Sequence, residues 1–449
     1  MQIPSVVVSV VPSNINKNEA FSLRRTKLFE KLPDKSLVII PNRNVSFRSQ
    51  DLENKFKPDS DFYYLTGFEE PNSICVLKKD SGKNTFMLFV EPKNKEKEIW
   101  VGKCTGVEGA KSIYNADESY STPEFNEQLK KLLQTADHIY IPFGNNKDLD
   151  LKITSYMGEV KKSNRSGKKT PSDISDPRDF IHKMRLVKDT FELSEMQKAI
   201  DITEEAFQVA MSLTKPNMFE YEIEAMIDSK FRSLGGIGPA YSSIVGSGAN
   251  ATILHYINNN MQIKDNDLVL VDAGCEFNNY AADVTRTYPS NHKFSSPQKD
   301  IYQIVLEAQL KAIEEAKPQK YFIDPHNKAV ETIVEGLKSL GLLKGSTQEI
   351  IDTGEYKKFY MHKTGHWLGL DVHDAGPYID DNGNPIKLTP GMVLTVEPGI
   401  YISNELPNVP EYFKGIGIRI EDDVLVTDTG NKILTAGIPK TVQEIEAIK

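Results

Sequence analysis

Two carboxylates that could share a cation, Asp272 and Asp283, flank an Asn-Asn pair at 278–279. Asparagine readily adopts positive φ, so this pair predicts a two-residue hairpin turn between strands at 267–277 and 280–288. In that register the aspartates are diagonal neighbours on one sheet face, roughly 7–8 Å apart at the backbone. A cation would relieve their repulsion in an otherwise apolar strand. A hairpin with exposed, solvated acids is the alternative at this point.

Further polar residues interrupt apolar segments in the C-terminal half. Glu397 ends an apolar run at a Pro-Gly turn, and residues 417–426 alternate like a strand, which places Arg419 and Glu421 on one face. A lone histidine is usually packed or solvated, and an arginine beside a glutamate could be a plain surface ion pair. Three of the chain's eight histidines nevertheless cluster within 360–374, at His362, His366 and His373.

Taken together, the ligand candidates are four carboxylates and one imidazole: Asp272, Asp283, His366, Glu397 and Glu421. Oxygen-rich sets with one nitrogen suit Mn²⁺, Co²⁺, Zn²⁺ or Fe²⁺ better than a structural zinc. Four negative charges balance two divalent cations, and such pairs in hydrolases hold a bridging water as hydroxide. Spacing alone does not single out these residues.

With 449 residues, the chain is long enough for two or three domains, each able to bury its own core. A net charge of −9 disfavours nucleic acid as a partner. The apolar run at 6–11 is too short to span a bilayer and lacks a basic flank, so we expect neither a membrane segment nor a secretory signal. Three cysteines without CxxC spacing favour the reducing cytoplasm, with processed import into mitochondria as the alternative.

The elements that must position these residues follow from hydrophobic periodicity. Alternating strand-like and helical runs over 20–160 predict an α/β layer domain, and the polar loop at 161–177 places a boundary near 178. In the first domain we expect strands at 37–41, 73–77, 84–90 and 138–142 and a helix at 125–133. In the second we expect a strand-rich domain with helices at 179–213, 220–234, 297–316 and 327–340.

These motifs resemble the aminopeptidase P and prolidase family of metallopeptidases, which shares the pita-bread fold with methionine aminopeptidase and creatinase. The resemblance covers most of the chain and rests on the segments 271–274, 283–287, 366–374, 395–399 and 417–422. It implies an α/β (α+β) protein, with a creatinase-type N-terminal α/β domain over 1–178 and a pita-bread catalytic domain over 179–449.

The resemblance also implies roles. The ligand candidates should hold a dinuclear centre, usually manganese, and Glu397 should also handle the proton of the bridging hydroxide. His255 matches a histidine that contacts the scissile carbonyl region, His373 one that stabilises the tetrahedral intermediate, and His362 one that contacts substrate. Arg419 should orient ligand carboxylates. Neutral imidazoles can donate to a developing oxyanion, so these roles are physically sound.

Two N-terminal segments, 61–71 and 98–102, look like those of aminopeptidase P, including its mitochondrial intermediate-cleaving relatives. In tetrameric members a tryptophan at the position of Trp100 reaches a neighbouring subunit's active site. We therefore expect Asp61 and Trp100 to contact substrate or a neighbouring subunit, and the chain to form a homodimer or homotetramer. The alternative for Trp100 is burial in its own domain, because large aromatic side chains are buried on average.

The expected activity is hydrolysis of the first peptide bond of peptides with proline in second position. One metal should bind the free α-amino group and hold the carbonyl near attack geometry. A strict Xaa-Pro dipeptidase (prolidase) and an intermediate-cleaving aminopeptidase without a proline requirement are alternatives. Outside enzymes, a pita-bread peptide- or protein-binding module is disfavoured, since such forms lose metal ligands and every ligand is present here.

Overall fold

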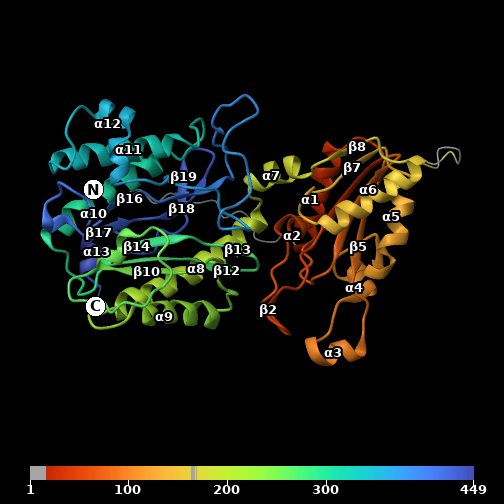
Figure 1. The fold of residues 1–449 in the computed structure, drawn as a ribbon, viewed down its shortest axis with the longest axis horizontal. Coiled ribbons are helices and arrows are strands. Elements are labelled where there is room, and N and C mark those ends of the chain that lie inside the picture. Colours follow the sequence, from red (N-terminus) through yellow and green to blue (C-terminus); the bar gives the residue numbers. More distant parts are fainter. Residues whose placement is uncertain (1–16, 163–166, 168, 449) are drawn as a thin grey trace. The chain divides into compact units, whose positions relative to one another are not determined.

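The computed structural model describes residues 17–162, 167 and 169–448, so the apolar run at 6–11 lies outside the described part. Figure 1 shows the helices and strands of the chain. Contacts divide it into two compact units between Arg185 and Leu186, a few residues beyond the boundary expected near 178. Among the described residues, no helix is long and apolar enough to cross a membrane.

A six-stranded mixed sheet forms the centre of the N-terminal unit. In spatial order its strands are β6 (Glu118–Ser121), β5 (Lys83–Val90), β4 (Ile74–Asp80), β1 (Ser36–Pro41), β7 (His138–Tyr140) and β8 (Asp173–Ser175). β1 is buried along its whole length, as its apolar run predicts for a central strand. A short hairpin adds β2 (Phe47–Ser49) and β3 (Leu52–Glu53).

The helices of this unit before residue 178 are α1 (Lys17–Lys31), α2 (Ser60–Thr66), α3 (Lys95–Val101), α4 (Gly106–Ser112), α5 (Phe125–Leu133) and α6 (Lys147–Lys162). The predicted helix at 125–133 is confirmed residue for residue by α5, whose apolar stripe packs on the sheet. The predicted loop at 161–177 is wrong in part, because β8 lies inside it and pairs in parallel with β7. β8 is a short, largely exposed edge strand, and it lacks the apolar alternation that marks a strand in a sequence.

Three helices, rather than the two expected, lie between 178 and 234: α7 (Arg178–Leu186), α8 (Thr190–Leu213) and α9 (Glu220–Ser233). The continuous helix expected at 179–213 is wrong. Val187 leaves the helical path to form a β-bridge with Met392, and Asp189 then caps α8 by accepting from the backbone N–H of Glu192. A helix start of this kind satisfies backbone donors that would otherwise lack partners.

The later helices of the C-terminal unit are α10 (Ser296–Glu315), α11 (Asp324–Ser339), α12 (Thr347–Thr353) and α13 (Val442–Glu446). α10 and α11 match the expected helices to within a few residues. The apolar faces of α8, α9, α10 and α11 share one hydrophobic core with the strands of this unit. The core therefore fixes the strand ends at which the polar candidates lie.

The predicted Asn-Asn hairpin is confirmed in its register. Asn278 and Asn279 have φ of 47° and 70°, and Phe277 pairs with Tyr280 across the turn. The long strands are each interrupted once, giving β11 (Leu268–Ala273), β12 (Cys275–Phe277), β13 (Tyr280–Ala281) and β14 (Val284–Pro289). The first strand is interrupted at Gly274 and the second at 282–283, and a Cβ on Gly274 would stand 1.7 Å from the carbonyl oxygen of Ala282.

The single strand expected at 417–426 is wrong, because the chain changes sheets within it. β17 (Ile416–Arg419) pairs with β16 (Gly399–Ile402), whereas β18 (Asp422–Val426) lies between β15 (Val393–Val396) and β19 (Asn431–Ile433). Between them the backbone N–H of Glu421 donates to the carbonyl of Thr285 on β14. The predicted faces hold, since Ile418 and Ile420 are fully buried in the core. The remaining strands of the unit are β9 (Gly238–Pro239) and β10 (Ile244–Ser247).

Candidate metal centre and active site

A cavity of about 860 Å³ opens in the C-terminal unit. Every ligand candidate lines it, and so does every catalytic candidate. These residues are Asp272, Asp283, His366, Glu397, Glu421, His255, His362, His373 and Arg419. An apolar wall completes the cavity, with Leu254, Ile257, Phe322, Ile323, Tyr378, Ile379 and Pro385. Residues from segments far apart in the sequence thus meet in one place.

Each ligand candidate lies at or beside the end of a strand. Asp272 is near the end of β11, Asp283 precedes β14, and Glu397 follows β15. Glu421 lies in the crossing between β17 and β18. His366 is held beside β15, because its backbone N–H donates to Oγ1 of Thr395 and its carbonyl accepts from the Thr395 N–H.

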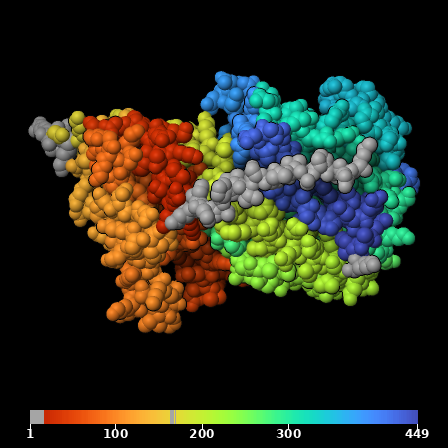
Figure 2. Space-filling view, turned by 180° about the vertical axis from the view of Figure 1, so that it is seen from behind, coloured from red at the N-terminus to blue at the C-terminus, as the bar shows by residue number. Residues whose placement is uncertain are grey.

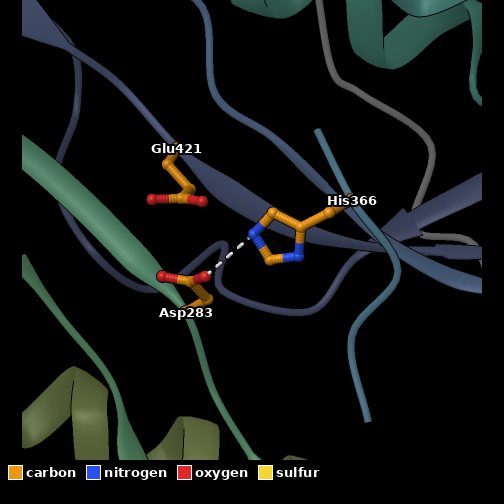
Figure 3. Close-up of side chains that lie close together, drawn as sticks. All are labelled: Asp283, His366 and Glu421. Carbon is orange, nitrogen blue, oxygen red and sulfur yellow. Dashed lines mark ion pairs between the residues drawn. The ribbon is translucent and has the colours of Figure 1, made fainter. Parts of the chain in front are cut away.

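Three of the ligand candidates converge most closely. One ligand atom each from Asp283, His366 and Glu421 lies within 4.8 Å of the others. Figure 3 shows these side chains pointing toward one another, with Nε2 of His366 3.3 Å from Oδ2 of Asp283. The same nitrogen is 3.7 Å from Oε1 of Glu397. Carboxylate and imidazole donors at this spacing fit a divalent cation.

The pKa shifts of the buried carboxylates also favour a site for divalent cations. Burial, added to the charges of neighbouring carboxylates, raises the pKa of Glu397 to about 7 and that of Glu421 well above its ordinary range. Burial likewise raises the pKa of Asp272. Buried carboxylates that repel one another are stabilised in their charged form by divalent cations.

Arg419 orients two of the ligand candidates. Its Nη2 donates to Oδ2 of Asp272 at 2.5 Å, and its Nε donates to Oγ1 of Thr285 at 3.1 Å. Thr285 in turn donates to Oε2 of Glu421 at 2.7 Å. Arg419 is only 4% exposed, so the surface ion pair considered for it is wrong.

A chain of hydrogen bonds fixes the ring of His362. Nη1 of Arg419 donates to the hydroxyl of Tyr401 at 2.9 Å, and this hydroxyl lies 2.8 Å from Nε2 of His362. On the other side of the ring, Nδ1 is 2.7 Å from the carbonyl of Lys363 and must be the protonated nitrogen. Burial lowers the pKa of His362 to about 3, so the imidazole is neutral and accepts from Tyr401.

The tautomer of His366 also follows from its partner. Its Nδ1 lies 3.0 Å from the carbonyl of Trp367 and therefore donates to it. Nε2 then faces the carboxylates. Burial alone would lower the pKa of His366, but the hydrogen bond to Asp283 and the neighbouring carboxylate charges raise it to about 9, so a metal ion bound by Nε2 would replace a proton there.

The other two histidine candidates, His255 and His373, line the cavity with exposed side chains. His373 is exposed and packs edge-on against His366, with ring centroids 4.3 Å apart. Burial and the neighbouring His366 lower the pKa of His373. His255 is exposed on the loop after β10. Neutral, accessible imidazoles can donate to a bound carbonyl.

Tyr241 is a site residue that sequence reasoning missed. Its hydroxyl lies 2.6 Å from Oδ1 of Asp272 and 2.5 Å from Oδ1 of Asp283. A phenol carries one proton, so it can donate to only one of the two carboxylates at a time. Burial raises the pKa of this phenol well above its ordinary value. No spacing or motif around Tyr241 distinguishes it from the chain's other tyrosines.

The two N-terminal candidates differ from each other. Asp61 is buried in α2 and accepts from Nη1 of Arg185 at 2.7 Å, while its other oxygen lies 3.0 Å from Nε2 of His182. Burial alone would raise its pKa, but these partners hold it below the ordinary value. Trp100 is 87% exposed on α3, so burial in its own domain is excluded. α3 projects from the rest of the N-terminal unit in Figure 2.

Comparisons with known proteins agree with this geometry. Residues 194–428 match "Metallopeptidase family M24", and residues 21–140 match "Aminopeptidase P, N-terminal domain". The chain belongs to metallopeptidase family M24. The expected fold is thereby confirmed as an aminopeptidase P N-terminal domain followed by an M24 pita-bread catalytic domain, and M24 membership implies divalent metal ions.

Named relatives of this M24 chain include bacterial and organellar enzymes. The Xaa-Pro aminopeptidase of Escherichia coli (strain K12) is 40% identical over 97% of this chain and 98% of its own. The mitochondrial intermediate cleaving peptidase 55 of Arabidopsis thaliana is 34% identical over 96% of this chain and 82% of its own.

Solved structures of aminopeptidases superpose on the M24 chain over nearly its whole length. Pseudomonas aeruginosa aminopeptidase PepP has a TM-score of 0.94 at 40% identity, covering 96% of this chain and 98% of that one. Zinc-substituted E. coli aminopeptidase P in complex with product gives 0.93 at 40% identity, covering 97% and 98%.

Proposed function

We propose that this chain is a metallo-aminopeptidase that hydrolyses the N-terminal Xaa-Pro bond of peptides. The observation that carries the proposal is the convergence of the complete ligand set on one cavity that also holds His255, His362 and His373. An intact ligand set disfavours a pita-bread binding module without catalysis. The match to Xaa-Pro aminopeptidases over nearly the full chain supports the same activity.

Two divalent ions would be held by the five ligand candidates named above, with manganese as the proposed metal. When bound, the ions supply Lewis-acid polarisation of the scissile carbonyl and lower the pKa of the attacking water. Cobalt, zinc or iron would suit the same donors, so the metal must be identified by measurement.

The chain's own residues supply proton transfer and orientation. Glu397 is the proposed proton carrier, which would take a proton from the attacking water and return it to the leaving amine. His255 and His373, which are exposed and line the cavity, would donate to the substrate carbonyl. Both ring nitrogens of His362 are hydrogen-bonded within the protein. A hydrogen bond from His362 to substrate would therefore replace its bond to Tyr401 or to Lys363.

The apolar wall of the cavity supports binding of proline, but it would also take a bulky apolar side chain. Among the described lining residues, the cations are Lys363 and Arg419, and Arg419 is committed to Asp272, Tyr401 and Thr285. A strict dipeptidase would have to bind the substrate's carboxylate with the remaining cation, Lys363. An intermediate-cleaving activity would use the same wall without requiring proline.

The experiment is to chelate the purified protein, restore it with Mn²⁺, and measure cleavage of Xaa-Pro-Yaa, Xaa-Pro and Leu-led peptides. Manganese-restored cleavage of the tripeptide above the other two supports the proposal. Preference for Xaa-Pro would indicate a prolidase, and equal cleavage of Leu-led peptides an intermediate-cleaving enzyme. Two bound metals with no cleavage of any peptide would contradict the proposal.

We also propose that Trp100 contacts another subunit of a homodimer or homotetramer, and that the protein works in the cytoplasm. Asp61 is buried against Arg185 and His182, so the direct contact is proposed for Trp100 alone. The exposed side chains of Ile99, Trp100 and Val101 on α3 support a contact with another subunit, because adjacent exposed apolar residues mark interaction sites. Free thiols at all three cysteines are consistent with a reducing compartment. Sedimentation of Trp100→Ala beside wild type tests the assembly, and an unchanged mass would argue against the role of Trp100.

A further inference from the structure

The loop that carries His255 has little regular structure of its own. After β10 the chain forms a 3₁₀ turn at Gly248–Thr252 and then runs irregularly to residue 262. Ile253, Ile257 and Met261 on this loop are each more than half exposed. Apolar burial on the loop is limited to Ala251, Leu254 and Tyr256, so polar contacts must supply much of its order. Yet Leu254, His255 and Ile257 all line the cavity, so the site depends on the loop staying in place.

One fully buried carboxylate, that of Glu220, accepts five hydrogen bonds from the loop. Oε1 of Glu220, at the start of α9, accepts from both the backbone N–H and the hydroxyl of Ser247, at 2.7 and 2.8 Å, and from Nδ2 of Asn250 at 3.0 Å. Oε2 accepts from the hydroxyl of Tyr256 at 2.8 Å and from the backbone N–H of Met261 at 2.9 Å.

The geometry of these bonds spans the whole loop. Ser247 lies at its start, Met261 near its end, and Tyr256 immediately follows His255. The backbone N–H of Glu220 also donates to the carbonyl of Met261 at 3.0 Å, which ties the loop end to α9 a second time. All five donors to the carboxylate are neutral, and bonds to a charged acceptor are stronger than neutral ones.

We propose that Glu220 is a positioning residue for the reaction: its buried carboxylate fixes the 247–261 loop and so aims His255 at the substrate carbonyl. The inference rests on the role proposed for His255. Glu220 is not one of the described residues that line the cavity, so it acts through the loop.

Glu220→Gln tests this with almost no change in volume. The amide replaces one acceptor oxygen by an NH₂ donor, which then faces either Ser247 and Asn250 or Tyr256 and Met261. The backbone N–H groups of Ser247 and Met261 cannot reverse their direction, so one side of the clamp opens in either orientation of the amide. Glu222→Gln is the matched control, because Glu222 lies on the same helix and caps it by accepting from the N–H of Phe219.

The first measurement is hydrogen exchange of the loop backbone, which does not depend on any activity. We expect faster exchange over 247–261 in Glu220→Gln than in wild type or Glu222→Gln, with bound metal unchanged. Equal exchange in all three proteins would overturn the clamp. If Glu220→Gln does not fold, Tyr256→Phe, which removes a single donor, must show the same local increase, and its absence overturns the clamp.

The second measurement is a double-mutant cycle with His255→Ala on a substrate that the wild type cleaves. Misplacement of a catalytic group by about 1 Å can cost 10²-fold, so we expect Glu220→Gln to lower kcat about 10- to 100-fold with KM changed less. In the His255→Ala background the same substitution should cost less than about 2-fold. An equal loss in both backgrounds, or no loss in wild type, would overturn the inference. A wild type that cleaves no peptide would contradict the proposed function while the exchange result still decides the clamp.

Discussion

Arg419 donates through Nη2 to Oδ2 of Asp272 at 2.5 Å, although the two residues are 147 positions apart in the chain. The same guanidinium donates through Nε to Thr285, whose hydroxyl donates to Glu421. One buried cation therefore orients two carboxylates that come from different strands. Hydrogen-bond partners of this kind fix the direction in which a carboxylate presents its oxygens to a metal ion.

Arg419→Lys should weaken metal binding and turnover about 10- to 100-fold, the usual cost of losing a second-layer partner. A lysine keeps the charge, but a single ammonium cannot reach Asp272, Thr285 and Tyr401 in the directions of a planar guanidinium. The measurement is a titration of chelated protein with Mn²⁺, followed by metal content and by kcat. Wild-type affinity in the lysine variant would show that charge alone suffices.

Asp283→Ala should remove at least one metal per chain and reduce kcat by more than about 10²-fold, since a ligand matters more than its supporting partner. Elemental analysis and peptide cleavage measure the two effects separately. Asp352→Ala is the control, because Asp352 is exposed on α12 and its carboxylate accepts only a helical contact from Gln348. Two bound metals with full activity in Asp283→Ala would refute the assignment of this ligand.

Gly274→Ala should destabilise the protein by about 1–3 kcal/mol or more, because the new methyl group would overlap the carbonyl oxygen of Ala282 at 1.7 Å. The two strands must then separate between Asp272 and Asp283, so metal affinity should fall as well. In contrast, Gly158→Ala in α6 meets no atom within 4 Å and should stabilise by about 0.5–1 kcal/mol. Urea unfolding and metal titration of both variants provide the comparison.

His326 should make stability depend on pH. Burial, followed by the charges of Lys363 and Lys357, lowers its pKa from 6.5 to about 4. Between these values the unfolded chain binds a proton that the folded chain does not, so stability rises with pH across this window and falls on acidification. The free energy of unfolding of wild type should lose on the order of 1–3 kcal/mol more than His326→Gln between pH 6.5 and 4. Parallel pH profiles for the two proteins would contradict the low pKa.

The hairpin could be predicted from sequence because its cause is local. Two adjacent asparagines tolerate positive φ, and the turn length then sets which residues face each other. The ligand candidates, in contrast, could not be selected from local sequence. His366, Glu397 and Glu421 come from separate segments, and only resemblance to a known family selected them from the chain's other polar residues.

Features that depend on distant partners escaped prediction. The change of sheets between β17 and β18 follows from a hydrogen bond of Glu421 to Thr285, which no local pattern reveals. Tyr241 was missed for the same reason, because its importance comes from Asp272 and Asp283 rather than from its neighbours in sequence. The end of α7 likewise follows from the bridge between Val187 and Met392. Local propensity is overridden in each case by tertiary contacts.

The Asn-Asn hairpin also bears on the order in which the site assembles. A two-residue turn brings Asp272 and Asp283 together with little loss of loop entropy, and isolated hairpins close within about 1–10 μs. His366, Glu397 and Glu421 can join them only when much longer loops close, which is slower. Two of the five ligand candidates are thus brought together by a short local segment, and the other three join them only once the chain has reached its full topology.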